Sequence, residues 1–140
     1  MKSLLLCTTL ALALPLCAAA ASVDDYAWHK RLLIVFASQS SLPELAKQRA
    51  LIADAKAGFS ERDMLSIEVI GNQVQGTTDS ADALRQRYHV APDTFRVLLI
   101  GKDGGVKIDS HEPVEMQRVF GTIDTMPMRR EEAQRNKPKS

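Results

Sequence analysis

The feature that most constrains the fold is an unbroken apolar run, Leu32–Ala37, which a helical pattern follows after a short polar connection. The run does not alternate apolar with polar residues, and this is typical of a strand covered on both faces. A second, mostly apolar run lies at residues 95–100. Two central strands of this kind predict a sheet with helices on both faces, which is a layered α/β domain.

The remaining segments give the order of the elements. Helical spacing and capping residues predict helices over residues 41–57, 79–88 and 113–126, and partial alternation predicts edge strands at 64–70 and 106–109. The first strand–helix–strand unit implies parallel pairing. The glycine-rich turn at 101–105 implies an antiparallel hairpin. The order βαβ, then α, then ββα predicts a thioredoxin-like fold with a mixed four-stranded sheet and helices on both faces.

The first long helix carries specific end signals. Ser41 and Glu44 have the spacing of a capping box, in which each side chain accepts a hydrogen bond from the backbone of the other. Gly58 is expected just beyond the last helical turn. An apolar stripe that includes Leu42 and Leu45 is expected to face the sheet.

Residues 1–21 have the pattern of a secretory signal peptide. Lys2 provides a positive charge, residues 3–16 are almost all apolar, and Ala19–Ala21 supplies the small residues that a signal peptidase recognises. Cys17 raises the alternative of a lipoprotein, but the residue before it, Leu16, is not small. The sequence therefore predicts export to the periplasm or the medium.

The cysteine content limits the chemistry. The two cysteines, Cys7 and Cys17, both lie in the predicted signal peptide. Cleavage after Ala21 would leave 140 − 21 = 119 residues and 2 − 2 = 0 cysteines. Thiol chemistry needs a thiolate, so we expect no thiol redox activity from the mature chain.

The charge and length of the chain predict one domain followed by a tail. Without Lys2 the chain has 18 − 1 = 17 basic and 17 acidic residues, so no charge excess favours nucleic acid or an anionic membrane. No second apolar run is long enough for stable membrane insertion. Residues 22–128 are predicted to form the domain, as a monomer, and the net-basic residues 129–140 a disordered tail.

Several blocks of the mature chain resemble a known family. The blocks RLLIVFA, LAKQRALI, ERDMLSIEVIG, FRVLLIGKDGGVKI and IDTMPMRREE are similar to successive blocks of the domain of unknown function 4174. The resemblance runs from about Trp28 to Glu132. It implies a thioredoxin- or peroxiredoxin-like fold in exported bacterial proteins, with a similar module in secreted, matrix-associated vertebrate proteins. It implies no catalytic residues.

The chain departs from active thioredoxins and peroxiredoxins at the position of their reactive cysteines. The start of the first helix reads Ser40-Ser41-Leu42-Pro43, with no cysteine. Thioredoxins also place a cis-proline directly before a central strand, whereas here two residues separate Pro92 from the strand. The isomer of Pro92 stays open, with trans as the default.

Other candidate site residues have simpler explanations. A nucleophilic Ser40 or Ser41 would need a base and an oxyanion hole, and no nearby motif supplies them. His29, His89 and His111, with Asp24 or Asp25 as further ligands, lack the close spacing of metal ligands. Arg49 and Lys56 fall within the predicted apolar stripe, where they would either extend their charges to water or form an anion site.

No catalytic, cofactor-binding or metal-binding residue is therefore assigned, and no cofactor is expected. The sequence favours a non-catalytic binding or structural module of the cell envelope, with an unknown protein or small molecule as partner. Two alternatives stay open: a cysteine-independent reductase or hydrolase on the same scaffold, and a metal-binding envelope protein.

Overall fold

The structure is a computed structural model that describes residues 21–138. The predicted signal peptide, with both cysteines, lies outside the described residues except for Ala21. The elements in chain order are β1 (Arg31–Ala37), η1 (Gln39–Ser41), α1 (Leu42–Ala53), α2 (Lys56–Glu61), β2 (Met64–Ile70), β3 (Gln73–Gln75), α3 (Ala81–Tyr88), β4 (Arg96–Ile100), β5 (Val106–Ser110), α4 (Met116–Asp124) and α5 (Pro127–Arg135).

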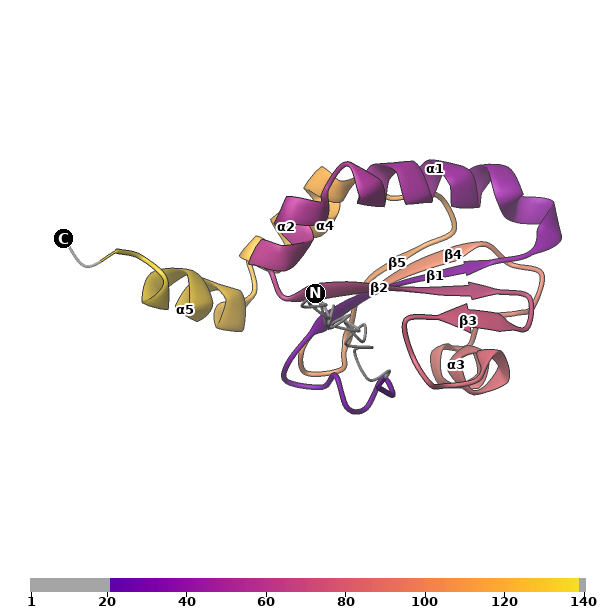
Figure 1. Ribbon diagram of the computed structural model, residues 1–140, viewed down its shortest axis with the longest axis horizontal. Helices are drawn as coiled ribbons and strands as arrows, with labels where there is room; N and C mark the ends of the chain where they lie inside the picture. Colours follow the sequence, from indigo (N-terminus) through magenta and orange to yellow (C-terminus); the bar gives the residue numbers. More distant parts are fainter. Residues whose placement is uncertain (1–20, 139–140) are drawn as a thin grey trace, which may run out of the picture.

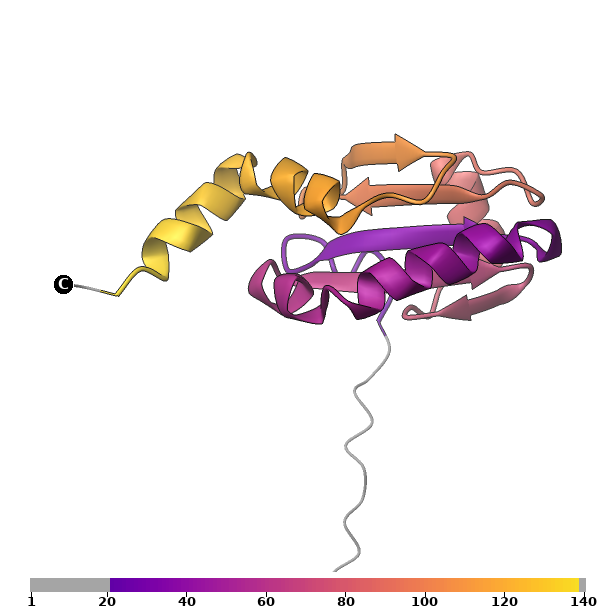
Figure 2. The same ribbon diagram turned by 90° about the horizontal axis from the view of Figure 1, so that it is seen from above.

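The strands form one mixed sheet in the order β3-β2-β1-β4-β5. β1 pairs in parallel with β2 and antiparallel with β4, and β5 pairs antiparallel with β4. The helices α1, α2 and α4 cover one face of the sheet and α3 covers the other (Figures 1 and 2). The strand order of β2, β1, β4 and β5 and the placement of these helices confirm the predicted thioredoxin-like fold.

The unbroken apolar run of β1 is explained by two separate cores. Leu33, Val35 and Ala37 pack with side chains of α1, α2 and α4 on one face. Leu32, Ile34 and Phe36 pack with Ala81 and Leu84 of α3 on the other face. Successive side chains of a strand point to opposite faces, so a strand covered on both sides needs an apolar residue at each position.

The sheet has five strands rather than the predicted four. Residues 73–75 form β3, which pairs antiparallel with the end of β2. The sequence pattern did not indicate this strand, because it is short and two of its three residues are glutamine. β2 is therefore an inner strand, and β3 occupies the edge.

The first helical region differs in its details from the prediction. α1 ends at Ala53, and Gly58 lies inside the separate helix α2, where a Cβ atom would overlap the ring of Phe120. Leu45 is buried, but Leu42 is 44% exposed. The inward face of α1 instead includes Gln48, because residues 45, 48 and 52 share one side of a helix and residue 42 lies beside it.

The predicted disordered tail, 129–140, is wrong for residues 129–135, which belong to α5. Ion pairs hold this helix. Glu132 accepts hydrogen bonds from both terminal nitrogens of Arg31, at 3.1 and 3.3 Å, and from Lys102 Nζ at 2.6 Å. Arg129 Nη2 lies 2.8 Å from Glu61 Oε1. The polar composition that predicted disorder thus supplies the contacts that order the helix.

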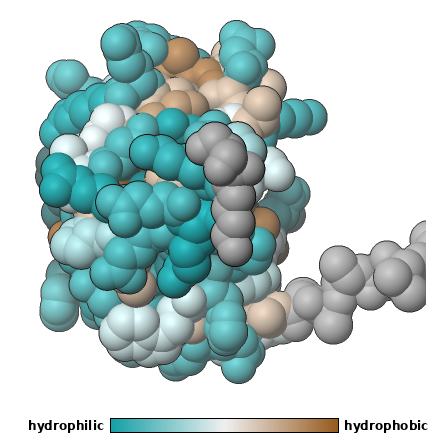
Figure 3. All heavy atoms as spheres, turned by 90° about the vertical axis from the view of Figure 1, so that its left-hand side faces the viewer, coloured by the Kyte–Doolittle hydropathy of each residue, from teal (hydrophilic) through white to brown (hydrophobic). Residues whose placement is uncertain are grey.

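The surface at the α5 end is mostly hydrophilic, with apolar residues in small groups (Figure 3). Within residues 21–138, no helix has both the length and the apolar character needed to cross a membrane.

Candidate functional site

A groove of about 390 Å³ lies where β1 leads into α1. Its lining includes Ser38, Gln39 and Ser40 from this junction, Asn72 after β2, and Asp93 before β4. These segments meet because the ends of the parallel strands β1 and β2 and the start of the antiparallel strand β4 share one edge of the sheet. Thioredoxins carry their reactive cysteines at this junction, and this chain has serines there.

The serines of the junction are engaged with one another. The Ser38 amide donates to Ser41 Oγ at 2.9 Å, and Ser41 Oγ donates to the Ser38 carbonyl at 3.2 Å. Ser38 Oγ and Ser40 Oγ lie 2.8 Å apart. Ser41 thus stabilises the 3-10 turn η1, and the predicted capping box between Ser41 and Glu44 is wrong. The turn places the Ser41 side chain back toward Ser38, away from the α1 amides.

Arg85 also lines the groove. It belongs to α3, which covers the face of the sheet opposite to α1 (Figure 1). It lies on α3 four residues after Ala81, on the side of the helix that packs against β1, and it is only 8% exposed. Its buried Nε has no hydrogen-bond partner. None of the ion pairs formed within residues 21–138 includes Arg85. Burial of a cation without a partner is energetically unfavourable, so an acceptor from outside the described residues would stabilise Arg85.

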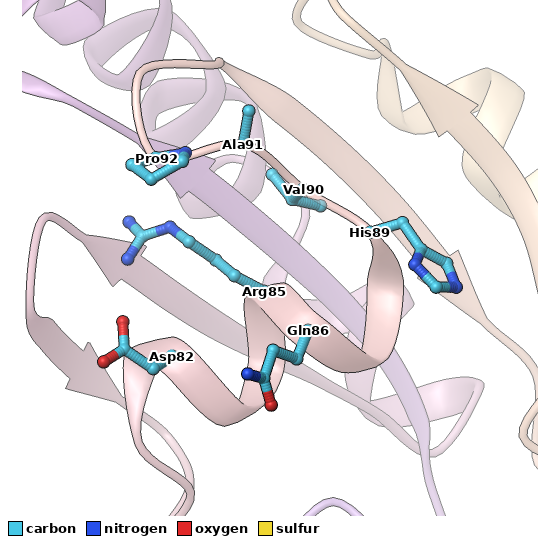
Figure 4. Close-up of a pocket in the computed structure, with 7 residues that line it drawn as sticks. All are labelled: Asp82, Arg85, Gln86, His89, Val90, Ala91 and Pro92. Carbon is cyan, nitrogen blue, oxygen red and sulfur yellow. The ribbon is translucent and has the colours of Figure 1, made fainter.

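A second hollow of about 550 Å³ adjoins the groove, and Arg85 and Pro92 line both. Asp82, Val90 and Ala91 complete much of its wall. The guanidinium group of Arg85 lies beside Pro92 and on the same side of α3 as Asp82 (Figure 4). The side chains of Gln86 and His89 point away from the guanidinium group (Figure 4). The two hollows therefore meet at a single buried positive charge.

The sequence-predicted candidates are scattered. Ser40 lines the groove, but His29, His89 and His111 are all exposed at separate places. In the part of the chain that the structure describes, no group of three or more His, Cys, Asp or Glu side chains is placed to hold a metal ion.

Arg49 and Lys56, which were predicted to lie within the apolar stripe of the first long helix, do not line the groove either. Arg49 Nη2 pairs with Glu68 Oε2 at 2.6 Å on the surface, and Lys56 is exposed on α2. Arg49 forms an ion pair between α1 and β2 instead of an anion site.

Arg85 was missed in the sequence. It lies in the last turn of α3, where a cation complements the helix dipole, and that position alone suffices to explain a basic residue. Its position could have been found from spacing, because residues 81, 84, 85 and 88 form one helical face and three of the four are apolar or aromatic. Pro92, which the sequence comparison with thioredoxins had pointed to, lines both hollows and follows a trans peptide bond.

The chain is similar to one described family and to a solved structure. The model of a family described as a domain of unknown function, DUF4174, matches residues 22–132. The chain belongs to this family. A solved thioredoxin-fold protein from Helicobacter pylori shares 14% identity, with 84% of this chain and 82% of that chain covered and a TM-score of 0.37. The fold of this DUF4174 domain follows from its strand order and helix placement (Figure 1).

Proposed function

We propose that this protein is an exported binding domain that holds a small molecule in the groove between β1, α1 and the start of β4. The observation that carries the proposal is the groove itself. Its volume of about 390 Å³ lies in the roughly 300–1,000 Å³ range of small-molecule sites, as do three other hollows, and its position beside the buried Arg85 distinguishes it from two of them. Its walls come from four separate parts of the chain, as is usual where a scaffold positions a ligand.

Binding is favoured over hydrolysis by the state of the serines. The hydroxyl groups of Ser38, Ser40 and Ser41 contact one another and the local backbone. A nucleophilic serine needs an adjacent base, and the hydrogen bonds of these serines within residues 21–138 include none to Asp93, the carboxylate in the groove lining. The groove can therefore offer hydrogen bonds and charge to a ligand without a nucleophile that is ready to react.

The location in the cell envelope is part of the proposal. It is supported by the signal-peptide pattern of residues 1–21, which lie outside the described residues except for Ala21. Cleavage near Ala21 would also remove both cysteines, so the exported domain would bind its ligand without thiol chemistry.

One preparation tests both parts. The protein is purified from the exported fraction of its own cells, and its intact mass is measured under denaturing and native conditions. We expect a mature N-terminus near Ser22, no lipid adduct, and a small-molecule adduct in the native spectrum. Gln39→Trp, which fills the groove, should lose the adduct, and Lys47→Trp on the exposed side of α1 should keep it.

Each part of the proposal has its own contrary result. A mass that includes residues 1–21, or a lipid on Cys17, would contradict the export proposal. An adduct that survives in folded Gln39→Trp protein, or no adduct in any preparation, would contradict binding in the groove.

A further inference from the structure

We propose that Arg85 binds the carboxylate group of the ligand, an inference that rests on the proposed binding function of the groove. The starting observation is a buried guanidinium group at the meeting point of two hollows. Its Nε lacks a hydrogen-bond partner, as does the Nε of Arg31. The terminal nitrogens of Arg31 are bound by Glu132, however, whereas Arg85 has no ion pair within residues 21–138. A carboxylate is the partner that matches a guanidinium group best, because two oxygen atoms can accept two parallel N–H bonds.

Comparison with the other buried cations makes Arg85 exceptional. Among residues 21–138, the buried basic side chains are Arg31, Arg85, Lys102 and Arg129. Three of them lie against a carboxylate: Arg31 at 3.1 Å, Lys102 at 2.6 Å and Arg129 at 2.8 Å. This protein therefore neutralises its buried cations by ion pairing, and Arg85 is the one left without a partner from the described chain.

The charges around Arg85 favour a single negative charge on the ligand. Asp82 lines one hollow and Asp93 lines the other. With one guanidinium group and two carboxylates in the walls, a doubly charged phosphate would meet repulsion that a carboxylate meets less strongly. The same two aspartates would attract a positive group elsewhere on the ligand.

The residues that line the two hollows indicate which other chemical groups the ligand carries. The groove offers the hydroxyl group of Ser40 and the amide of Asn72 for further hydrogen bonds. The adjoining hollow offers the apolar side chains of Val90 and Ala91. The expected ligand is a small carboxylic acid, with polar groups on one side of the carboxylate and apolar groups on the other.

Asp82 is the internal alternative to a ligand. It lies three residues before Arg85 on α3, a spacing at which oppositely charged side chains often pair on a helix. In the structure the two do not form an ion pair, although both lie on the same side of α3 (Figure 4). If Asp82 competes with the ligand, Asp82→Asn will strengthen carboxylate binding.

The test is an NMR titration of the purified, ¹⁵N-labelled protein at constant ionic strength. Acetate is the carboxylate probe, methyl acetate the neutral probe and inorganic phosphate the multiply charged probe. We expect acetate to shift the Arg85 Nε–H signal and the amide signals of Ser40 and Asp93 in a saturable manner. Arg85→Met should weaken acetate binding by roughly tenfold to a hundredfold, and Arg85→Lys should weaken it less.

Arg87→Met is the matched control. Arg87 lies on the same helix, but its side chain is 44% exposed and pairs with Asp24 at 2.8 Å. This variant should bind acetate as the unmodified protein does. Asp82→Asn should bind acetate at least as tightly.

Three results would overturn the assignment. Equal binding of acetate by folded Arg85→Met protein would show that Arg85 does not bind the ligand. Stronger binding of methyl acetate or of phosphate would show that the ligand group is not a carboxylate. In both cases a ligand adduct that Gln39→Trp abolishes would leave the binding function of the groove intact. No response to any probe, together with no adduct, would overturn both proposals.

Discussion

Gln48 is a fully buried polar residue in the layer between α1 and the sheet. Its Nε2 donates to the Val114 carbonyl at 3.1 Å, and its Oε1 accepts from the Val114 amide at 2.7 Å. Val114 precedes α4 and is itself buried. The side chain thus satisfies two backbone groups that would otherwise be buried without partners, and it connects α1 to the segment that leads into α4.

Gln48→Met should destabilise the fold by about 3 kcal/mol, because it keeps the volume of the side chain but leaves the Val114 amide and carbonyl unpaired. Lys47→Met is the control, since residue 47 is exposed on the same helix and should change stability by less than about 0.5 kcal/mol. Urea unfolding measures both. Equal stability of the two variants would show that Val114 does not depend on Gln48.

Gln48 and Arg85 illustrate what the sequence can and cannot predict at the residue scale. Of the two apolar residues named in the predicted stripe, Leu45 was placed correctly, since burial is its usual state, whereas Leu42 is exposed. A polar residue at an inward position is normally taken to face water. For Gln48 the reason for burial is a backbone group 66 residues away, and for Arg85 it is a site built from several loops.

At the scale of elements, α5 depends on charge rather than on apolar packing. Its contacts include Glu132 with Arg31 and Lys102, and Arg129 with Glu61 and Asp124. The helix predicted over residues 113–126 stops before Pro127, but proline is common in the first turn of a helix, and here it begins α5. The partner Arg31 lies 101 residues away along the chain, so local composition could not reveal the pairing.

Glu132→Gln should destabilise the protein by about 3 kcal/mol, because it leaves Arg31 and Lys102 buried with one negative charge fewer. Glu131→Gln, on the exposed side of the same helix, should have an effect below about 0.5 kcal/mol. Urea unfolding and hydrogen exchange of the α5 amides measure the loss. Unchanged protection of α5 in Glu132→Gln would mean that the ion pairs do not hold the helix.

These and neighbouring ion pairs should make the free energy of unfolding depend on pH. Burial raises the pKa of Glu132, but hydrogen bonds from Lys102 and Arg31 outweigh it, so the pKa lies below its ordinary value. The hydrogen bond from Lys102 lowers the pKa of Asp63, and that from Arg62 lowers the pKa of Asp124. Because the unfolded chain binds these protons more readily, stability should fall as the pH drops below about 5. Glu132→Gln should show a shallower fall.

At the scale of the whole molecule, the sequence predicted the layers and the order of the four main strands. The two apolar runs identified the central strands, and the glycine turn identified the β4–β5 hairpin. The extra strand β3 was missed because three residues with two glutamines carry little pattern. The fold brings Arg85 of α3 to the junction after β1, where the binding groove forms.

A fold that keeps an unpaired buried cation at this place is less stable than it needs to be. Replacement of Arg85 by methionine would remove an uncompensated charge while filling a similar space. Replacing buried charged groups by apolar residues of similar volume is often neutral or stabilising, so Arg85→Met should not destabilise the ligand-free protein. A ligand that binds the folded state alone would restore the stability of the unmodified protein.

The most direct measurement is the free energy of unfolding of the unmodified protein and of Arg85→Met across a series of acetate concentrations, with sodium chloride keeping the ionic strength constant. We predict that Arg85→Met is at least as stable without acetate, and that rising acetate stabilises the unmodified protein but not the variant. A variant that is clearly less stable without acetate, or two proteins that respond in parallel to it, would contradict a carboxylate-binding role for Arg85.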